Sequence, residues 1–257
     1  MDAIFSILSL PLFIIAFFIA LFAGVIKGIV GFAMPMIMLS GISTFADPEL
    51  ALAALILPTL FTNGMQVFRY GLSDVWQAIK RFKMFLCIGA LTLFSAAQLV
   101  PVLSTNLLLL VIGLAVTGFA LWQLSGRAPE PGQWSQNKML DAGIGAFAGI
   151  VGGLSGMWGP PTVAYLTAIG TQKKQQMLAQ GVIYGLGALL LMLGHWKSGV
   201  LNSTTLPLSL ALLIPAIFGM WLGGQISDRF DQATFRNVTL LVLILGGLNL
   251  LRRGIFG

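Results

Sequence analysis

The stretch FAGVIKGIVGFAMP, at residues 22–35, returns as FAGIVGGLSGMWGP at residues 147–160. Identical residues recur at a constant spacing of 125 positions. The pairs are Phe22 and Phe147, Ala23 and Ala148, Gly24 and Gly149, Gly28 and Gly153, Gly31 and Gly156, and Pro35 and Pro160. Both copies lie within long apolar runs, about half a chain apart. Because glycine and proline interrupt helices, the pair predicts two related halves, each with a broken membrane segment.

The composition separates this chain from soluble proteins. Of its 257 residues, 57% are hydrophobic and 9% are charged, whereas a soluble domain carries roughly 25% charged residues. So few charges cannot cover a water-facing surface, and we expect an integral membrane protein. The net charge is +6, but the basic residues lie in short loops between apolar runs, as membrane orientation requires. No Lys/Arg run with interleaved aromatic residues occurs, so nucleic acid is not an expected partner.

Residue types that carry metal or covalent chemistry are scarce. Cys87 is the only cysteine and His195 the only histidine, so an intrachain disulfide is excluded and no metal-ligand spacing is visible. We therefore expect no metal and no other cofactor. Ser155 has no deep histidine or aspartate nearby, so an enzyme is not expected either. His195 ends an apolar run, where an interfacial position is expected and a proton relay is the alternative.

The apolar runs define the expected membrane segments. In the first half they cover 5–26, 33–42, 49–68, 82–100 and 106–124, and in the second half 138–154, 161–169, 176–193, 206–225 and 234–251. A crossing needs roughly 20 residues, so the short runs 33–42 and 161–169 are predicted to be second arms of hairpins. The Gly- and Pro-rich stretch 125–137 is predicted to be a linker. The predicted units are a first repeat 1–124, this linker, and a second repeat 138–257.

Charges at the hairpin turns differ between the halves. Asp47 and Glu49 lie at the first turn, whereas Lys173 and Lys174 lie at the second. Because Lys/Arg-rich short loops stay in the cytoplasm, the basic loop 69–83 and the second turn are expected inside and the first turn outside. Arg252 and Arg253 would then lie outside, against the rule. The prediction is an all-α membrane protein of two inverted-topology repeats, each a broken hairpin plus three transmembrane helices, about eight spans in all; parallel repeats are the alternative.

Lys27 is the only charge well inside an apolar run. A charge at membrane depth costs roughly 2.5–3.5 kcal/mol even on gentle insertion scales, so it marks a functional site by default. The other interpretation is a lysine that reaches the headgroups. Gly152 holds the equivalent place in the second copy, so the charge is not part of the duplicated scaffold. An added cation is consistent with an anionic substrate.

The interrupted segments supply further candidates. Pro35 and Pro160 fit the first turn of a helix, and unpaired backbone N–H groups at such an end attract anions. Polar and aromatic residues of neighbouring segments could line the same site, although interhelical hydrogen bonds are an alternative role for them. Small-xxx-small packing is likewise an alternative role for the glycines. The predicted substrate-binding set is Lys27, Gly28, Gly31, Pro35, Asn63, Gln66, Gly153, Gly156, Trp158, Pro160, Gln180 and Tyr184.

The duplicated pattern resembles the signature of the TauE/SafE sulfite-exporter family, also called the sulfonate uptake permease family. The resemblance rests on Gly24 to Pro35, on Gly149 to Pro160, and on a later glycine-rich segment with Pro215, Gly219, Gly223 and Gly224. It extends over the length and two-half organisation of the chain. It implies a multi-pass transporter of the cytoplasmic (inner) membrane that carries small sulfur-containing or organic anions, such as sulfite, sulfonates or sulfoacetate-like compounds.

The sequence-based function is therefore a secondary transporter that works by alternating access, with a passive anion channel or pore as the alternative. The expected partners are a small anionic substrate and the lipid bilayer. A coupling ion, either a proton or sodium, and a homodimer are left open. No Asp or Glu lies deep in a segment, so a buried carboxylate relay for protons is not expected.

Overall fold

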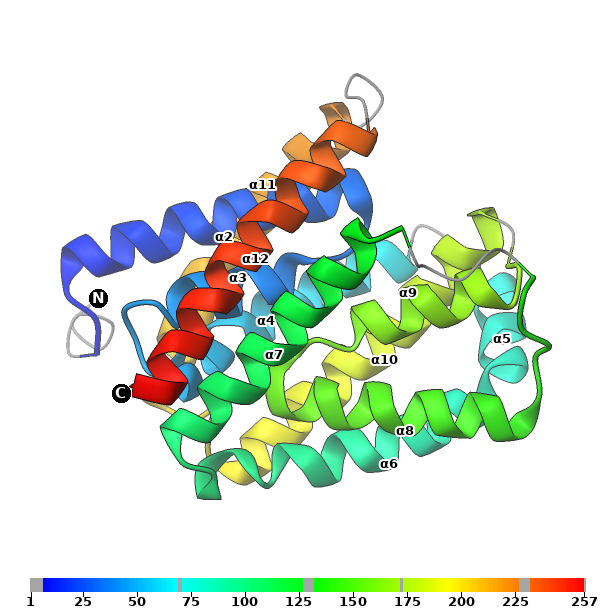
Figure 1. Cartoon of the computed structure of the whole chain (residues 1–257), viewed down its shortest axis with the longest axis horizontal. Helices are drawn as coiled ribbons and strands as arrows, with labels where there is room; N and C mark the ends of the chain where they lie inside the picture. Colours follow the sequence, from blue (N-terminus) through cyan, green and yellow to red (C-terminus); the bar gives the residue numbers. More distant parts are fainter. Residues whose placement is uncertain (1–6, 69–70, 127–131, 172, 227–231, 257) are drawn as a thin grey trace.

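The computed structural model describes residues 7–68, 71–126, 132–171, 173–226 and 232–256, and within them it contains helices and no strand. The predicted all-α class is confirmed (Figure 1). The elements are α2 (Leu10–Val30), α3 (Met34–Ile42), α4 (Pro48–Val67), α5 (Leu72–Arg81), α6 (Lys83–Ala97), the 3₁₀ turn η1 (Val100–Val102), α7 (Thr105–Leu124), α8 (Lys138–Ser155), α9 (Gly159–Ala168), α10 (Lys173–Ser198), α11 (Leu206–Ile226) and α12 (Gln232–Phe256). Their order follows the expected segments closely.

Six helical stretches among the described residues are long and apolar enough to cross a membrane. They are Leu10–Ile29, Pro48–Val67, Lys83–Val102, Thr105–Leu124, Leu178–Ser198 and Leu206–Ile226. At nine and ten residues, α3 and α9 are too short to cross alone, as expected for hairpin arms. The arrangement of about eight spans in inverted repeats stays a prediction.

The expected loop 69–83 contains a helix, α5, and this part of the prediction is wrong. The helix is amphipathic: Ala78 is buried and Ile79 is partly buried, while Asp74, Gln77 and Lys80 are exposed. Asp74 lies in its first turn and Lys80 and Arg81 in its last, a charge order that stabilises the helix dipole. A search for membrane-length apolar runs misses such a helix because it is short and polar on average. Arg69 lies outside the described residues.

The helices pair across the two halves. Helix α2 packs along α11, and α8 packs along α6 (Figure 1). Glycines permit both crossings, because a methyl group added to Gly24 or Gly28 would overlap the backbone of α11, and one added to Gly149 or Gly153 would overlap the backbone of α6. Such close backbone approach is typical of membrane helix interfaces. Four of the duplicated glycines therefore serve packing.

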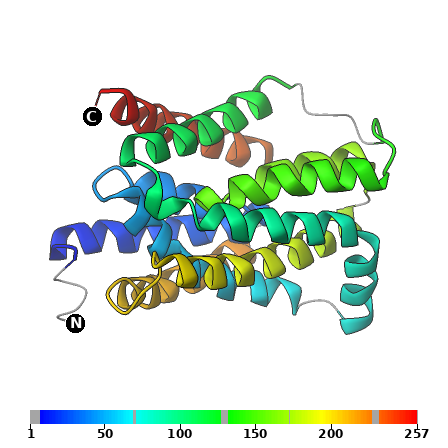
Figure 2. The same ribbon diagram turned by 90° about the horizontal axis from the view of Figure 1, so that it is seen from below.

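The two hairpin turns lie at opposite ends of the bundle (Figure 2). At one end, the Arg253 guanidinium donates to the carbonyl of Ser43, the residue that caps α3. At the other end, Arg81 of α5 donates to Gln136 at 3.3 Å and to Gln175 at 3.2 Å. Arg253 thus stabilises the C-terminus of α3, which explains locally why a basic residue lies at the end that also holds Asp47. The side chains of Lys173 and Lys174 lie outside the description.

Helix α4 contains Pro58, whose ring removes one backbone donor. The carbonyl of Ala54, left without that donor, accepts a hydrogen bond from Ser209 Oγ of α11 at 3.3 Å. Ser209 in turn accepts from the N–H of Leu57 at 3.1 Å. Backbone groups at membrane depth need such partners. The proline therefore ties α4 to α11 just before the turn of α4 that carries Thr62 and Asn63.

Candidate functional site

Both duplicated motifs break their helices at the last shared glycine. Helix α2 ends at Gly31, with φ of 82°, and α8 ends at Gly156, with φ of 72°. Both values lie in the left-handed region, where glycine is tolerated and other residues are strained. Ala33, which precedes α3, also has a positive φ of 75°. This strained, non-glycine residue lies next to the cavity described below, as strained backbone at functional sites often does.

The two breaks meet at one small buried cavity of about 20 Å³. Its lining comes from α2, α4, α10 and both interrupted segments: Lys27, Phe32, Ala33, Pro35, Met36, Asn63, Gly156, Met157, Trp158, Gly159 and Tyr184. A cavity needs roughly 10–15 Å³ to hold one water. In this conformation the cavity has room for about one water, so an oxyanion requires it to expand.

Lys27 supplies the positive charge of this cavity. Its side chain is 2% exposed, and its ammonium donates to Thr62 Oγ1 at 2.9 Å and to Asn63 Oδ1. Both acceptors are neutral, and within the described residues no carboxylate forms an ion pair with Lys27. An ammonium has three donors, so one stays unused. A buried charge is stable only when it is paired and hydrogen-bonded, and this cation lacks an ionic partner.

The acceptors of Lys27 connect it to the second half of the chain. Asn63 Nδ2 donates to the carbonyl of Tyr184 on α10 at 3.1 Å. The Tyr184 hydroxyl donates to the carbonyl of Gly159, at the start of α9, at 3.3 Å. The hydrogen bonds therefore lead from the first broken helix to the start of the second hairpin arm. A rearrangement of Lys27 would therefore affect both halves.

The starts of α3 and α9 do not offer equal numbers of backbone donors. Helix α3 begins with Met34, Pro35 and Met36, so it carries two N–H groups in its first turn. Helix α9 begins with Gly159, Pro160 and Pro161, and proline has no N–H. Anion binding by helix N-termini would therefore use α3 more than α9. The side chain of Pro160 lies outside the described residues.

The two motifs carry their large side chain at different positions. In the first, position 27 is a lysine and position 33 an alanine; in the second, the matching positions are Gly152 and Trp158. A Cβ on Gly152 would lie 2.9 Å from Cε3 of Trp158, so the indole occupies the space that a side chain at 152 would need. Trp158 is 4% exposed and lines the cavity. One copy thus places a cation at the cavity and the other an aromatic wall.

The remaining predicted residues lie near this cavity but are not part of its lining. Gly28 and Gly153 lie at the helix crossings described above. Gly31 forms the break in the first motif, and Gln180 Oε1 would lie 3.9 Å from a Cβ placed on that glycine. Gln66 and Gln180 are each 7% exposed, and Gln66 Oε1 has no hydrogen-bond partner. A role in substrate binding stays a prediction for all of them.

His195 is fully buried among the described residues, near the end of the candidate span Leu178–Ser198. Its position at the membrane interface stays a prediction. Helix α10 continues to Ser198 and brings His195 Nε2 to 3.0 Å from the carbonyl oxygen of Gly153. A carbonyl only accepts, so Nε2 carries the proton of this bond. Gly153 belongs to the last turn of α8, whose carbonyls lack partners within the helix. His195 therefore stabilises the end of α8 just before its break.

A second buried polar cluster was missed from the sequence. Asp141, in the first turn of α8, is 5% exposed and accepts a hydrogen bond from the hydroxyl of Tyr165, which is fully buried in α9. Gln136 donates to the other carboxylate oxygen at 3.4 Å and accepts from Arg81. An acidic residue in a first helical turn is ordinary, so no signal in the sequence marked it. The cluster joins α9 to α8 and α5 at the end that carries Lys80 and Arg81.

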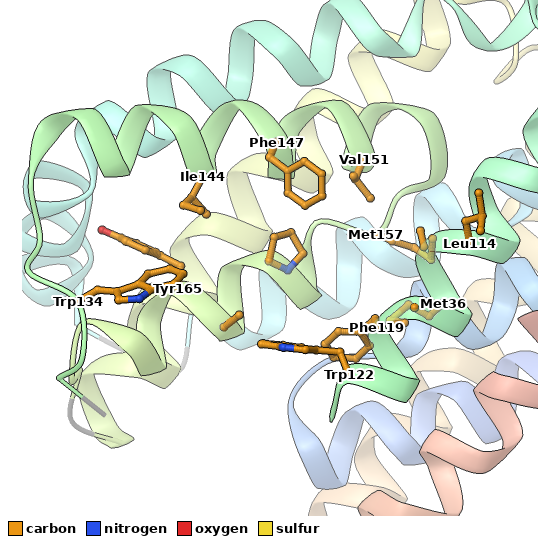
Figure 3. A pocket seen from close by; sticks show the side chains of 14 residues that line it. Met36, Leu114, Phe119, Trp122, Trp134, Ile144, Phe147, Val151, Met157 and Tyr165 are labelled. Carbon is orange, nitrogen blue, oxygen red and sulfur yellow. The ribbon is translucent and has the colours of Figure 1, made fainter. Parts of the chain in front are cut away.

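A larger, apolar groove of about 460 Å³ lies between α7, α8 and α9, and it is open to the protein surface, since Leu114 and Phe147 in its walls are 63% and 57% exposed. Figure 3 shows Phe119 and Trp122 of α7 facing Ile144 and Phe147 of α8 across it. Tyr165 and Trp134 line it near the cluster around Asp141, and Met36 and Met157 line its inner end. The same two methionines line the small cavity around Lys27. We call this larger space the vestibule.

Fold and site together define a multi-pass membrane protein with two interrupted helices that meet at a buried cation. A comparison with protein families gives the particular group. The model described as "Sulfite exporter TauE/SafE" matches residues 16–250, so the chain belongs to this family of membrane transporters, and the resemblance noted from the motifs is confirmed. The search of curated proteins and the search of solved structures gave no match.

Proposed function

We propose that this protein is a secondary transporter of small sulfur-containing or organic anions, such as sulfite, sulfonates or sulfoacetate-like compounds, in the cytoplasmic (inner) membrane. The observation that carries the proposal is Lys27, a buried lysine with two neutral hydrogen-bond acceptors and no ionic partner among the described residues. A bound anion would supply the missing charge and accept from the third ammonium donor. The first-turn N–H groups of α3 lie beside the same cavity and would add to the binding.

Alternating access is supported by a difference between the halves. Tyr165 of α9 lines the vestibule, whereas its counterpart Ser40, 125 positions earlier, lies against α12, where a Cβ on Gly246 would be 3.4 Å from Ser40 Oγ. One side of the site is thus hollow and the matching side is closed. Exchange of these two packings would open the site first to one membrane face and then to the other, as inverted repeats do.

The decisive variant is Lys27→Met, tested on purified protein by thermal shift with sulfite, sulfonates and carboxylates. A ligand that binds only the folded state raises apparent stability by mass action. We expect wild-type protein to be stabilised by one of these anions, and Lys27→Met to bind it roughly 10- to 100-fold more weakly, since a hydrogen bond to a charged group contributes about 1.5–3 kcal/mol. Methionine is apolar, so the fold should survive the change.

Lys138→Met is the matched control, because Lys138 is exposed at the start of α8. It should bind anions as the wild type does. Unchanged anion binding by Lys27→Met would overturn the proposal. In proteoliposomes, saturable uptake that is accelerated by counter-flow would separate a transporter from a passive channel, which shows neither, and proton and sodium gradients imposed in the same vesicles would identify the coupling ion.

A further inference from the structure

The vestibule has the wrong surface for a bare inorganic anion. Its walls are almost entirely hydrocarbon and aromatic, with Phe119, Trp122 and Phe147 among the largest side chains. A small oxyanion that entered it would lose water without gaining hydrogen bonds, which is strongly unfavourable. At about 460 Å³, the vestibule falls in the range of cavities that bind small organic molecules, roughly 300–1,000 Å³.

Two methionines separate this apolar space from the cation. Met36 and Met157 each line both the vestibule and the cavity around Lys27. They come from the starts of the two hairpin arms, one from each half. Methionine has an unbranched, flexible side chain that adapts to different partners. The partition between the apolar space and the charge is therefore made of the side chains that move most readily.

Taking the transport function above as given, we propose that the preferred substrate is an organic anion with an apolar body. The apolar body occupies the vestibule, and the acidic group passes between Met36 and Met157 to reach Lys27. The arrangement is complementary at both ends: hydrocarbon walls face the body, and an ammonium with no ionic partner among the described residues faces the charge. The vestibule, rather than the cavity around Lys27, then determines which anion is selected.

Gly118 offers a way to test the vestibule alone. It lines the vestibule on α7, and a Cβ added there meets no atom within 4 Å. Gly118→Leu should therefore fill the space without displacing backbone. Gly143 of α8 is the matched control: it is exposed, does not line the vestibule, and also has open space around an added Cβ. The same substitution at the two positions separates occupancy of the vestibule from any general effect of a new leucine.

The experiment measures the dissociation constants of methane-, butane-, hexane- and octanesulfonate with detergent-purified protein. The charge is constant and only the chain grows. We expect affinity to rise about fourfold per added methylene until the vestibule is full, the value for burying one CH₂. In Gly118→Leu this increase should stop at a shorter chain, and in Gly143→Leu it should match the wild type. Lys27→Met should weaken binding of every member.

Each other outcome has a definite meaning. If methanesulfonate binds in a Lys27-dependent way but longer chains bind no better, the inference is wrong and the transport proposal stands. If no sulfonate or other anion binds, the transport proposal itself fails. If Lys27→Met leaves the affinity for every chain length unchanged, or if the increase with chain length persists undiminished in Gly118→Leu, the chains bind as lipid or detergent tails do, and the inference is overturned.

Discussion

At the scale of single residues, Lys27 defines the site by what surrounds it. Its position inside an apolar run was visible in the sequence. Its neutral acceptors Thr62 and Asn63 lie on another helix, α4, 35 and 36 residues further along the chain. A surface-reaching lysine would be exposed, whereas this one is 2% exposed. The ammonium is therefore enclosed by the protein, and the alternative of a side chain that extends outward to the headgroups does not describe this structure.

Asn63→Asp should weaken anion binding strongly while the protein stays folded. The change is isosteric and places a carboxylate where Asn63 Oδ1 now accepts from Lys27. The new carboxylate would neutralise the ammonium and repel a bound anion. We expect anion affinity to fall by more than tenfold, since like charges in close contact cost several kcal/mol. Thermal shift with and without anion measures both binding and stability.

Gln98→Glu is a suitable control for that change. Gln98 is half-buried at the end of α6, bonds to the carbonyls of Phe94 and Gly194, and does not line the Lys27 cavity. The Gln98→Glu change adds the same negative charge outside the Lys27 cavity, so anion binding should persist. Retained anion affinity in Asn63→Asp would mean that Lys27 does not hold the substrate.

At the scale of elements, the glycines of the duplicated motif have two structural roles. Gly24, Gly28, Gly149 and Gly153 let helices cross closely, whereas Gly31 and Gly156 end them. The sequence pattern alone could not separate these functions, because small residues suit both backbone breaks and tight packing. Only the neighbours across the crossing, α11 and α6, distinguish the two. The order along each motif is the same: packing comes first and the break follows.

Gly153→Ala should destabilise the protein even without substrate. The added methyl would overlap the carbonyl of Leu93 on α6, which is backbone and cannot give way locally. Overpacking of this kind costs roughly 1–3 kcal/mol, so the thermal midpoint should fall. Gly143→Ala, on the same helix with open space around its Cβ, should keep or raise the midpoint because alanine favours helix more than glycine. An unchanged midpoint in Gly153→Ala, together with weakened anion binding, would instead assign Gly153 to the substrate.

At the scale of the whole molecule, the turns of the two hairpins lie at opposite ends of the bundle (Figure 2). The Ser43 end carries Arg253, and the Arg81 end carries Gln136 and Gln175. The same opposition was expected from the change of charge between the two hairpin turns. The vestibule lies between α7, α8 and α9.

Single cysteines at the two turns should react from opposite sides of the membrane. The native cysteine, Cys87, is first replaced by alanine; Thr44 and Gln175 are exposed positions at the two ends. With a membrane-impermeant maleimide, we expect Thr44→Cys to react in intact cells and Gln175→Cys only in inverted vesicles. This follows from the excess of Lys and Arg at the Gln175 end. Labelling of both positions from one side would exclude inverted hairpins.

The sequence by itself determined the membrane class, the family, the two broken segments and the one lysine inside an apolar run. These follow from the composition, from the length of the apolar runs and from a repeat in register. All three can be read along the sequence without knowing which segments meet in space. The tertiary structure decided the rest: the amphipathic helix α5, the burial of His195 against Gly153, the Asp141–Tyr165 pair and the apolar vestibule. Each of these depends on which side chains meet across helices distant in sequence, because burial and hydrogen bonding are set by neighbours that no single segment encodes.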